Sequence, residues 1–265
     1  NMWINKAEQS GTTGRDDDGN GYADDVYGYN FALGTSRLTW DVEAYDDKGK
    51  NVGDSGHGTH VAGTVAAVSN NGVGVSGIAG GTGRNDGVKL MSCQIFSGGE
   101  GGSAAVSAEA IKYAADNGAS ILQCSWGYPA GAVTTDNAYA SGARIEKQAI
   151  DYFIATKNNA VLDGGLVIFA AGNDAKAMSG YPGAYRDYIS VTAFSPDYLP
   201  AYYTNYGPGC NVAAPGGDAY ISPSGSSAAQ VLSTLPSELY QSDYGYMQGT
   251  SMACPHVSGV AALGL

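Results

Sequence analysis

Segments of strand length alternate with segments of helix length through the middle of the chain, and this alternation limits the possible folds more than any other feature. The apolar, strand-length runs are 88–96, 120–126, 165–171 and 188–194, and the helix-length segments between them are 104–117 and 141–158. Strand–helix–strand units of this kind place parallel strands side by side. We therefore predict an α/β fold with three layers, in which helices cover both faces of a mostly parallel central sheet.

A second constraint comes from residues 249–265, which have the sequence GTSMACPHVSGVAALGL and the spacing of small and apolar residues that a buried helix requires. Pro255 has no backbone N–H and is tolerated best in the first turn of a helix, so we predict that this helix begins near Ser251. There the Ser251 hydroxyl would lie beside unpaired backbone N–H groups and the positive end of the helix dipole. Ser251 is therefore a candidate nucleophile, although a serine at this place can also act only as a helix cap.

Two further blocks contain residues whose side chains suit a site with a serine nucleophile. Residues 54–64, DSGHGTHVAGT, place His57 on a glycine-rich approach to another small-residue helix, and residues 167–174, VIFAAGND, form an apolar strand that ends at Asn173 on a glycine turn. Together with GTSMACPHVSG, these blocks resemble, in the same order, the signature blocks of the subtilisin-like serine peptidases. Shorter matches extend the resemblance over nearly the whole chain, at Gly80, 181–183 and 214–216.

The resemblance implies a subtilisin-like fold and a serine endopeptidase that hydrolyses peptide bonds. Ser251 would attack the carbonyl, and His57 would act first as general base and then as general acid. The Asn173 amide and the Ser251 backbone N–H would bind the oxyanion. The glycine-rich run 97–103 is a possible strand edge for an extended peptide, while Trp126 could instead be a core aromatic. The candidate substrate-binding residues are Gly99, Gly101, Ser125, Trp126 and Gly127.

The aspartate that should orient the histidine has no candidate in its usual place. The family carries it after a strand, usually in a D-[TS]-G motif, and no such strand precedes Asn1. Asp54, in the D-S-G at 54–56, is too near His57 along the backbone to reach the far side of the ring. We therefore expect residues 1–265 to be one peptidase domain that is incomplete at both ends. We also expect its triad aspartate to lie outside this chain, so that the chain alone is inactive or nearly so.

An acidic stretch, residues 16–25, has the sequence DDDGNGYADD and resembles most of an EF-hand loop, except that the twelfth position is Tyr27 rather than glutamate. Such a turn suits a calcium ion that stabilises the fold, and the alternative is a solvated acidic loop. The candidate ligands are Asp16, Asp18, Asn20, the carbonyl of Tyr22, and Asp24, with Asp25 as a possible substitute.

Composition limits the possible partners and the compartment. The net charge of −12 argues against nucleic acid, and no apolar run has the length of a membrane span. No signal peptide is recognised, so we expect any targeting segment outside this sequence. The resemblance implies a secreted or cell-envelope protein that acts on polypeptides, with a propeptide or further domains in the full protein. We predict mostly free, buried thiols for the four cysteines, Cys93, Cys124, Cys210 and Cys254.

Three alternatives remain open. The chain could be a catalytically inactive relative with a binding or structural role, although the presence of His57, Asn173 and Ser251 argues against this. A cysteine hydrolase that uses Cys254 is disfavoured, because Cys254 lies inside a predicted buried helix beside Pro255. His60 forms an H-x-x-H pair with His57, but without a third ligand we expect a structural, hydrogen-bonded side chain rather than a zinc ligand.

Overall fold

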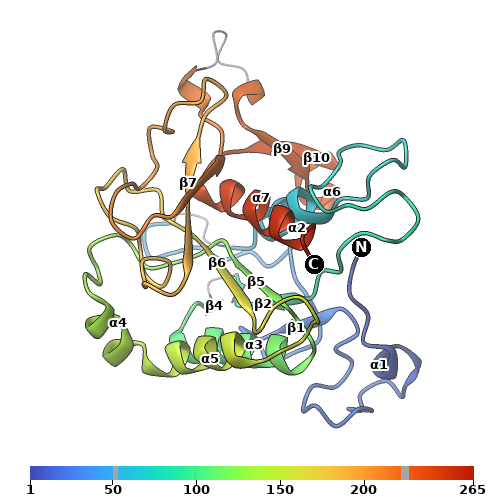
Figure 1. Cartoon of the computed structure of the whole chain (residues 1–265). Helices are drawn as coiled ribbons and strands as arrows, with labels where there is room; N and C mark the ends of the chain where they lie inside the picture. Colours follow the sequence, from blue (N-terminus) through green and yellow to red (C-terminus); the bar gives the residue numbers. More distant parts are fainter. Residues whose placement is uncertain (50–52, 99, 222–226) are drawn as a thin grey trace.

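The computed structural model describes residues 1–49, 53–98, 100–221 and 227–265. Its centre is a parallel sheet of four strands in the order β5–β6–β7–β8 (Figure 1). These strands are β5 (Ile121–Cys124), β6 (Leu166–Ala170), β7 (Ile189–Phe194) and β8 (Val212–Pro215). A separate parallel pair consists of β1 (Gly28–Asn30) and β2 (Ser92–Gln94). Two short antiparallel pairs are β3 (Phe96–Ser97) with β4 (Glu100–Gly101), and β9 (Val231–Thr234) with β10 (Tyr244–Met247).

Helices cover both faces of the central sheet, as predicted. In Figure 1, α3 and α5 lie together on one side of the sheet, and α2 and α7 lie together on the other. The helices are α1 (Lys6–Ser10), α2 (His57–Ala66), α3 (Ala104–Asp116), α4 (Asp136–Gly142), α5 (Arg144–Ala155), α6 (Ser237–Tyr240) and α7 (Thr250–Ala262). No described helix is long and apolar enough to cross a membrane.

Alternate residues of β6 supply the two cores between these layers. Val167 and Phe169 belong to the cluster under α3 and α5, whereas Ile168 and Ala170 belong to the cluster under α7. This division follows from the strand geometry, since successive side chains point to opposite faces of a sheet. Burial on both faces is why the strand is an almost unbroken apolar run in the sequence.

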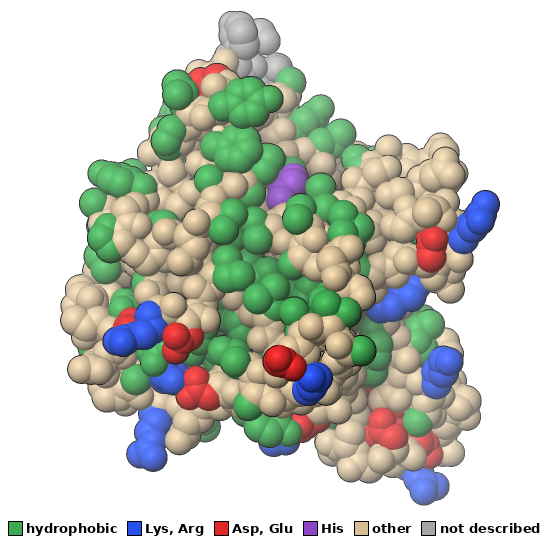
Figure 2. Space-filling view, in the orientation of Figure 1, with side chains coloured by type: hydrophobic (Ala, Val, Ile, Leu, Met, Phe, Trp, Pro, Cys, Tyr) green, Lys and Arg blue, Asp and Glu red, His purple; other side chains and the backbone are tan. Residues whose placement is uncertain are grey.

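At their amino-terminal ends, the strands of the sheet carry partly buried apolar side chains. Ile121, Leu166 and Ile189 are the first residues of β5, β6 and β7, and they pack against the α7 cluster. Figure 2 shows apolar side chains gathered in a band across this view, over β6 and between α7 and α5. Ser125 and Asn173 instead follow the carboxyl ends of β5 and β6, so the candidate site lies at the opposite edge of the sheet.

Two predicted boundaries were wrong. The run 88–96 is not one strand, because β2 ends at Gln94 and Phe96 begins a hairpin with β4. The helix predicted at 141–158 is two helices, since Ala143 leaves helical geometry (φ −112°, ψ 41°) between α4 and α5. Helix α7 begins at Thr250, next to Ser251 as predicted, but Pro255 therefore lies in its second turn rather than in its first.

Candidate active site

Ser251 lies at the amino-terminal end of α7, directly after a glycine that has an unusual backbone conformation. Gly249 has φ +148°, a value that side-chain-bearing residues rarely adopt, and the helix begins at the next residue. The half-buried Ser251 hydroxyl donates a hydrogen bond to the Ser125 carbonyl at 3.2 Å. The serine is therefore at the positive end of a helix of thirteen residues, as predicted.

Pro255 changes how the backbone around Ser251 is held. In a regular helix the residue-255 N–H would donate to the Ser251 carbonyl, but proline has no N–H. The Ser125 hydroxyl donates to this carbonyl instead, at 2.7 Å, and the Gln123 amide in turn donates to the Ser125 hydroxyl at 2.8 Å. This chain of bonds is why the helix tolerates a proline in its second turn, and it connects the end of β5 to the candidate nucleophile.

The Asn173 side chain is oriented by the first residue of the serine helix. Its Oδ1 accepts hydrogen bonds from the backbone N–H and the hydroxyl of Thr250, both at 2.9 Å. Because the amide oxygen is used in this way, the amide NH₂ group is available to another acceptor. Asn173 and Ser251 line the same pocket, of about 260 Å³. The structure therefore brings together two of the three predicted catalytic residues.

His57 is the first residue of α2 and is half-buried. Burial, and then the neighbouring His60, hold the pKa of His57 below its usual value, so its neutral, proton-accepting form is favoured. Among the described residues, no side chain forms a hydrogen bond with the His57 ring. His57 lines a second pocket, of about 190 Å³, which it shares with Ser125 and Trp126.

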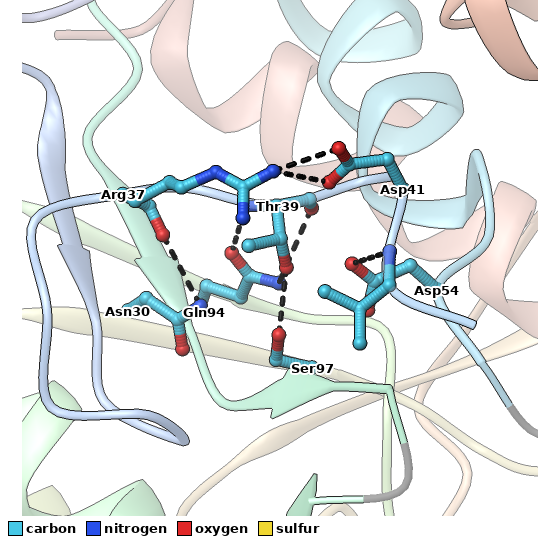
Figure 3. A network of polar contacts seen from close by, with 8 residues as sticks. Asn30, Arg37, Thr39, Asp41, Asp54, Gln94 and Ser97 are labelled. Carbon is cyan, nitrogen blue, oxygen red and sulfur yellow. Dashed lines mark hydrogen bonds and ion pairs between the residues drawn. The ribbon is translucent and has the colours of Figure 1, made fainter. Parts of the chain in front are cut away.

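Asp54 does not orient the histidine. Its carboxylate accepts hydrogen bonds from the backbone N–H groups of Gly98, at 2.6 Å, and Val42, at 3.2 Å. Figure 3 shows Asp54 beside a polar network that ties the segment around Arg37 and Asp41 to β2 and β3, with Thr39 bonded to both Gln94 and Ser97. Asp54 thus helps to anchor the turn after β3, in agreement with its exclusion as the triad acid.

The pocket beside His57 separates β2 from β5. No described residues pair these two strands, so the parallel pair β1–β2 and the four-stranded sheet are separate sheets. The pocket is lined from β2 and the residue after it by Cys93 and Ile95, and from β5 by Leu122, Gln123 and Cys124. Val61 of α2 and Ile111 of α3 also line it. It is therefore a mainly apolar space lined by residues of both β2 and β5, with His57 also in its lining.

The predicted substrate-binding residues do not all line the same pocket. Ser125 lines the His57 pocket, Gly127 lines the Ser251 pocket, and Trp126 lines both. The Trp126 ring also packs edge-on against Phe169, with centroids 5.3 Å apart, so this residue lines both pockets and also belongs to the core. Gly101 lies in β4 and pairs with Phe96, so one edge of this short strand is already occupied. Gly99 lies outside the described residues.

The acidic stretch folds into a cluster that differs from the predicted register. Asp16 and Asp18 lie together, as predicted, but the third carboxylate within 4.8 Å is Glu8 of α1. Glu8 is 6% exposed and accepts hydrogen bonds from the backbone N–H groups of Asp17 and Asp24. Backbone N–H groups of the turn, that of Gly21 foremost, lower the pKa of Asp16. Carboxylates in such a group are ligands that calcium prefers.

The remaining candidate ligands have other partners. The Asp24 carboxylate accepts from the Gly14 N–H and does not belong to the carboxylate group. Asn20 donates to Asp18 and to Asp25, and Asp25 is fully buried and also accepts from Tyr113. The Tyr22 ring packs among aromatic residues and its hydroxyl donates to Glu109, but neither contact involves its carbonyl, which stays a predicted ligand. The predicted role of Asp24 and the substitute role of Asp25 are therefore not supported by their side-chain positions.

The cysteines and His60 have structural environments. All four cysteines are free, as predicted, but only Cys124 and Cys254 are buried, whereas Cys93 and Cys210 are half-buried. Cys254 is fully buried, and burial raises its pKa to about 12, so its thiol is neutral near pH 7 and is a poor nucleophile. His60 is also fully buried, and its Nε2 lies 3.0 Å from the Val231 carbonyl and 3.2 Å from that of Gly245. His60 thus connects α2 to β9 and β10, which confirms its predicted structural role.

Comparison with known proteins assigns the chain to a family. Residues 26–265 match the model of the subtilase family, and the chain belongs to that family. The chain is 34% identical to alkaline elastase YaB of Bacillus sp. strain YaB, over 80% of this chain and 46% of that protein. It is 32% identical to subtilisin Savinase of Lederbergia lenta, over 79% of this chain and 62% of that protein. The chain spans about half the length of the curated relatives it matches.

The fold is also similar to solved protease structures. A structure described as proteases from Pseudoalteromonas arctica PAMC 21717 aligns with a TM-score of 0.64 and 32% identity, covering 87% of this chain and 65% of that one. A second, the prenylagaramide maturation protease, aligns with a TM-score of 0.56 and 26% identity, covering 80% and 65%. These similarities confirm the predicted subtilisin-like α/β fold.

Proposed function

We propose that this chain is the greater part of the catalytic domain of a serine endopeptidase that cleaves polypeptides. The observation that carries the proposal is the arrangement of Asn173 and Ser251 in one pocket, with the Asn173 amide held by Thr250. Membership of the subtilase family and similarity to named proteases support the same conclusion.

The chemistry would proceed through Ser251. Its hydroxyl would leave the Ser125 carbonyl, lose its proton to neutral His57, and attack the peptide carbonyl. The Asn173 NH₂ group and the Ser251 N–H would donate to the oxygen as it becomes an anion, an interaction that is stronger in the transition state than with the substrate. His57 would then return its proton to the leaving amine. The pocket beside Ser251 would hold a substrate side chain next to the cleaved bond.

The acid that orients His57 would come from outside residues 1–265. The space between β2 and β5 supports this part of the proposal, because it is mainly apolar, is lined by strands of two separate sheets and has His57 in its lining. A strand in that space would pair with both neighbours and could end in a carboxylate beside the imidazole. Without it, residues 1–265 would be inactive or nearly so.

Labelling with a fluorophosphonate probe, which reacts with activated serines, tests the proposed nucleophile. The protein with its upstream residues included should be labelled, and Ser251→Ala should abolish the labelling. Ser141→Ala is the matched control, since Ser141 is exposed on α4 and should be replaceable without effect. No labelling of a folded protein would contradict the proposal and favour the inactive relative with a binding or structural role.

We also propose that calcium binds to the acidic cluster and stabilises the fold, with Glu8, Asp16 and Asp18 as the ligands. The ion would balance the mutual repulsion of three carboxylates. Chelation should therefore lower the thermal unfolding temperature, and Asp16→Asn should remove this sensitivity. An unfolding temperature that chelation leaves unchanged would exclude the site.

By analogy with the subtilase family, we further propose that the protein is secreted or located at the cell envelope. By the same analogy, we propose that the full protein has a propeptide or further domains.

A further inference from the structure

Glu146 of α5 is a buried carboxylate that the proposed mechanism does not use. It is 1% exposed, and no described lysine or arginine forms an ion pair with it. Three hydroxyl groups donate to it instead: Ser107 at 2.6 Å, Tyr139 at 3.0 Å and Tyr128 at 3.2 Å. Burial of a carboxylate without a cation is costly unless hydrogen bonds satisfy it, so this group of side chains specifies one arrangement.

Two of these hydroxyl groups belong to residues that line the candidate site. Tyr128 lines the pocket that contains Asn173 and Ser251, and Ser107 of α3 lines the pocket that contains His57. Tyr139 of α4 is fully buried and packs against Tyr181, so it holds the network to the core. Glu146 is therefore the point at which helices α3, α4 and α5 meet the wall of the Ser251 pocket.

The backbone of that wall is fixed independently of Glu146. The Tyr128 N–H donates to the Tyr181 carbonyl at 2.6 Å, and the Ala130 N–H donates to the Asp174 carboxylate at 3.1 Å. What these bonds leave undetermined is the direction of the Tyr128 ring. The two contacts of its hydroxyl with Glu146, at 3.2 and 3.3 Å, supply that restraint.

We propose that Glu146 is a positioning residue that holds Tyr128 in the wall of the Ser251 pocket and thereby sets which substrate side chain the pocket accepts. The inference rests on the proposed function, because the pocket is taken to bind a substrate side chain. Without the carboxylate the Tyr128 hydroxyl loses its acceptor, and the half-buried ring is held only by its packing against the core under α3 and α5, so its angle can change. The consequence is a change of pocket shape and hence of selectivity, with the reacting groups left in place.

The test compares Glu146→Met, which keeps the length of the side chain but removes its acceptor oxygens, and Tyr128→Phe in the active form of the enzyme, with two peptide substrates that differ only in having Phe or Ala before the cleaved bond. Each variant should change the ratio of the two KM values at least threefold, in the same direction, while kcat for the Ala substrate stays within twofold. The double variant should show no further change, since both substitutions remove the same contact. Tyr152→Phe is the matched control, because Tyr152 is on the same helix and its hydroxyl donates to Asp116 away from the site.

An unchanged ratio in both variants, or an equal change for both substrates with a lower unfolding temperature, would reduce Glu146 to a structural residue. A second measurement does not depend on activity. In protein labelled with 3-fluorotyrosine, the ¹⁹F signal of Tyr128, assigned by its loss in Tyr128→Phe, should shift or broaden in Glu146→Met as the ring loses this restraint. An unaltered signal would overturn the proposal, whereas failure of the proposed function would appear as absent fluorophosphonate labelling in the unmodified protein.

Discussion

Fluorophosphonate labelling of Ser251 is expected to be 10²- to 10⁴-fold faster in a form of the protein that includes its upstream residues than in residues 1–265 alone. That range is about what a correctly positioned acid–base group contributes to a reaction. Among the described residues, no side chain forms a hydrogen bond with the His57 ring that would fix its direction or stabilise the imidazolium formed during attack. Labelling rates of the two forms, measured at equal concentration and pH, give the ratio directly.

The control is a variant of the extended protein. In it, the aspartate of the upstream residues that lies nearest His57 is replaced by asparagine. This variant should fold like the extended protein yet be labelled as slowly as residues 1–265. A separate readout reports whether the space between β2 and β5 is filled. Cys93 lines this space and is half-buried, so an organomercurial should react with it in residues 1–265 and not in the extended protein. Equal labelling rates in the short and extended forms would show that the acid is not supplied from upstream.

The central part of the fold could be predicted because its determinants are local. The β6 segment has apolar residues for both faces, a glycine turn follows it, and Gly118 ends the helix before β5, so each element is specified by neighbouring residues. The division of 141–158 into α4 and α5 was not predictable in the same way. Ala143 is a strong helix former, yet it is buried at the junction of the two helices, and tertiary packing decides its conformation.

The candidate site was likewise predictable only where its residues are specified by their neighbours in the sequence. Ser251, Asn173 and His57 each lie in a short block in which sequence order alone places the functional side chain at the end of a helix or strand. Their partners come from distant segments: Glu8 reaches the acidic turn from α1, and Ser125 reaches the Ser251 carbonyl from the end of β5. The lack of an N–H at Pro255 was the one available signal, because it requires some other donor for that carbonyl. Nothing local indicates that the donor is Ser125.

Replacing Asn173 with alanine is expected to lower kcat by 10- to 150-fold, with little change in KM. The proposed bond from the Asn173 amide to the developing oxyanion would be a hydrogen bond to a charged group. Such a bond is worth about 1.5–3 kcal/mol, and each 1.4 kcal/mol corresponds to about a factor of ten in rate. KM should be nearly unaffected, because the charge does not yet exist in the bound substrate. Steady-state kinetics with one peptide substrate separate the two constants.

Alanine also removes the acceptor for Thr250, so a loss of rate could arise from disorder at the start of α7. Asn173→Asp resolves this ambiguity, because it keeps an oxygen for the Thr250 N–H and hydroxyl but replaces the NH₂ donor with a second oxygen. Aspartate should therefore preserve the free energy of unfolding in urea better than alanine does, and yet lower kcat at least as far, since its charge repels the oxyanion. If aspartate instead retained the activity of the unmodified enzyme, Asn173 would act only by holding Thr250, and the oxyanion would need another donor.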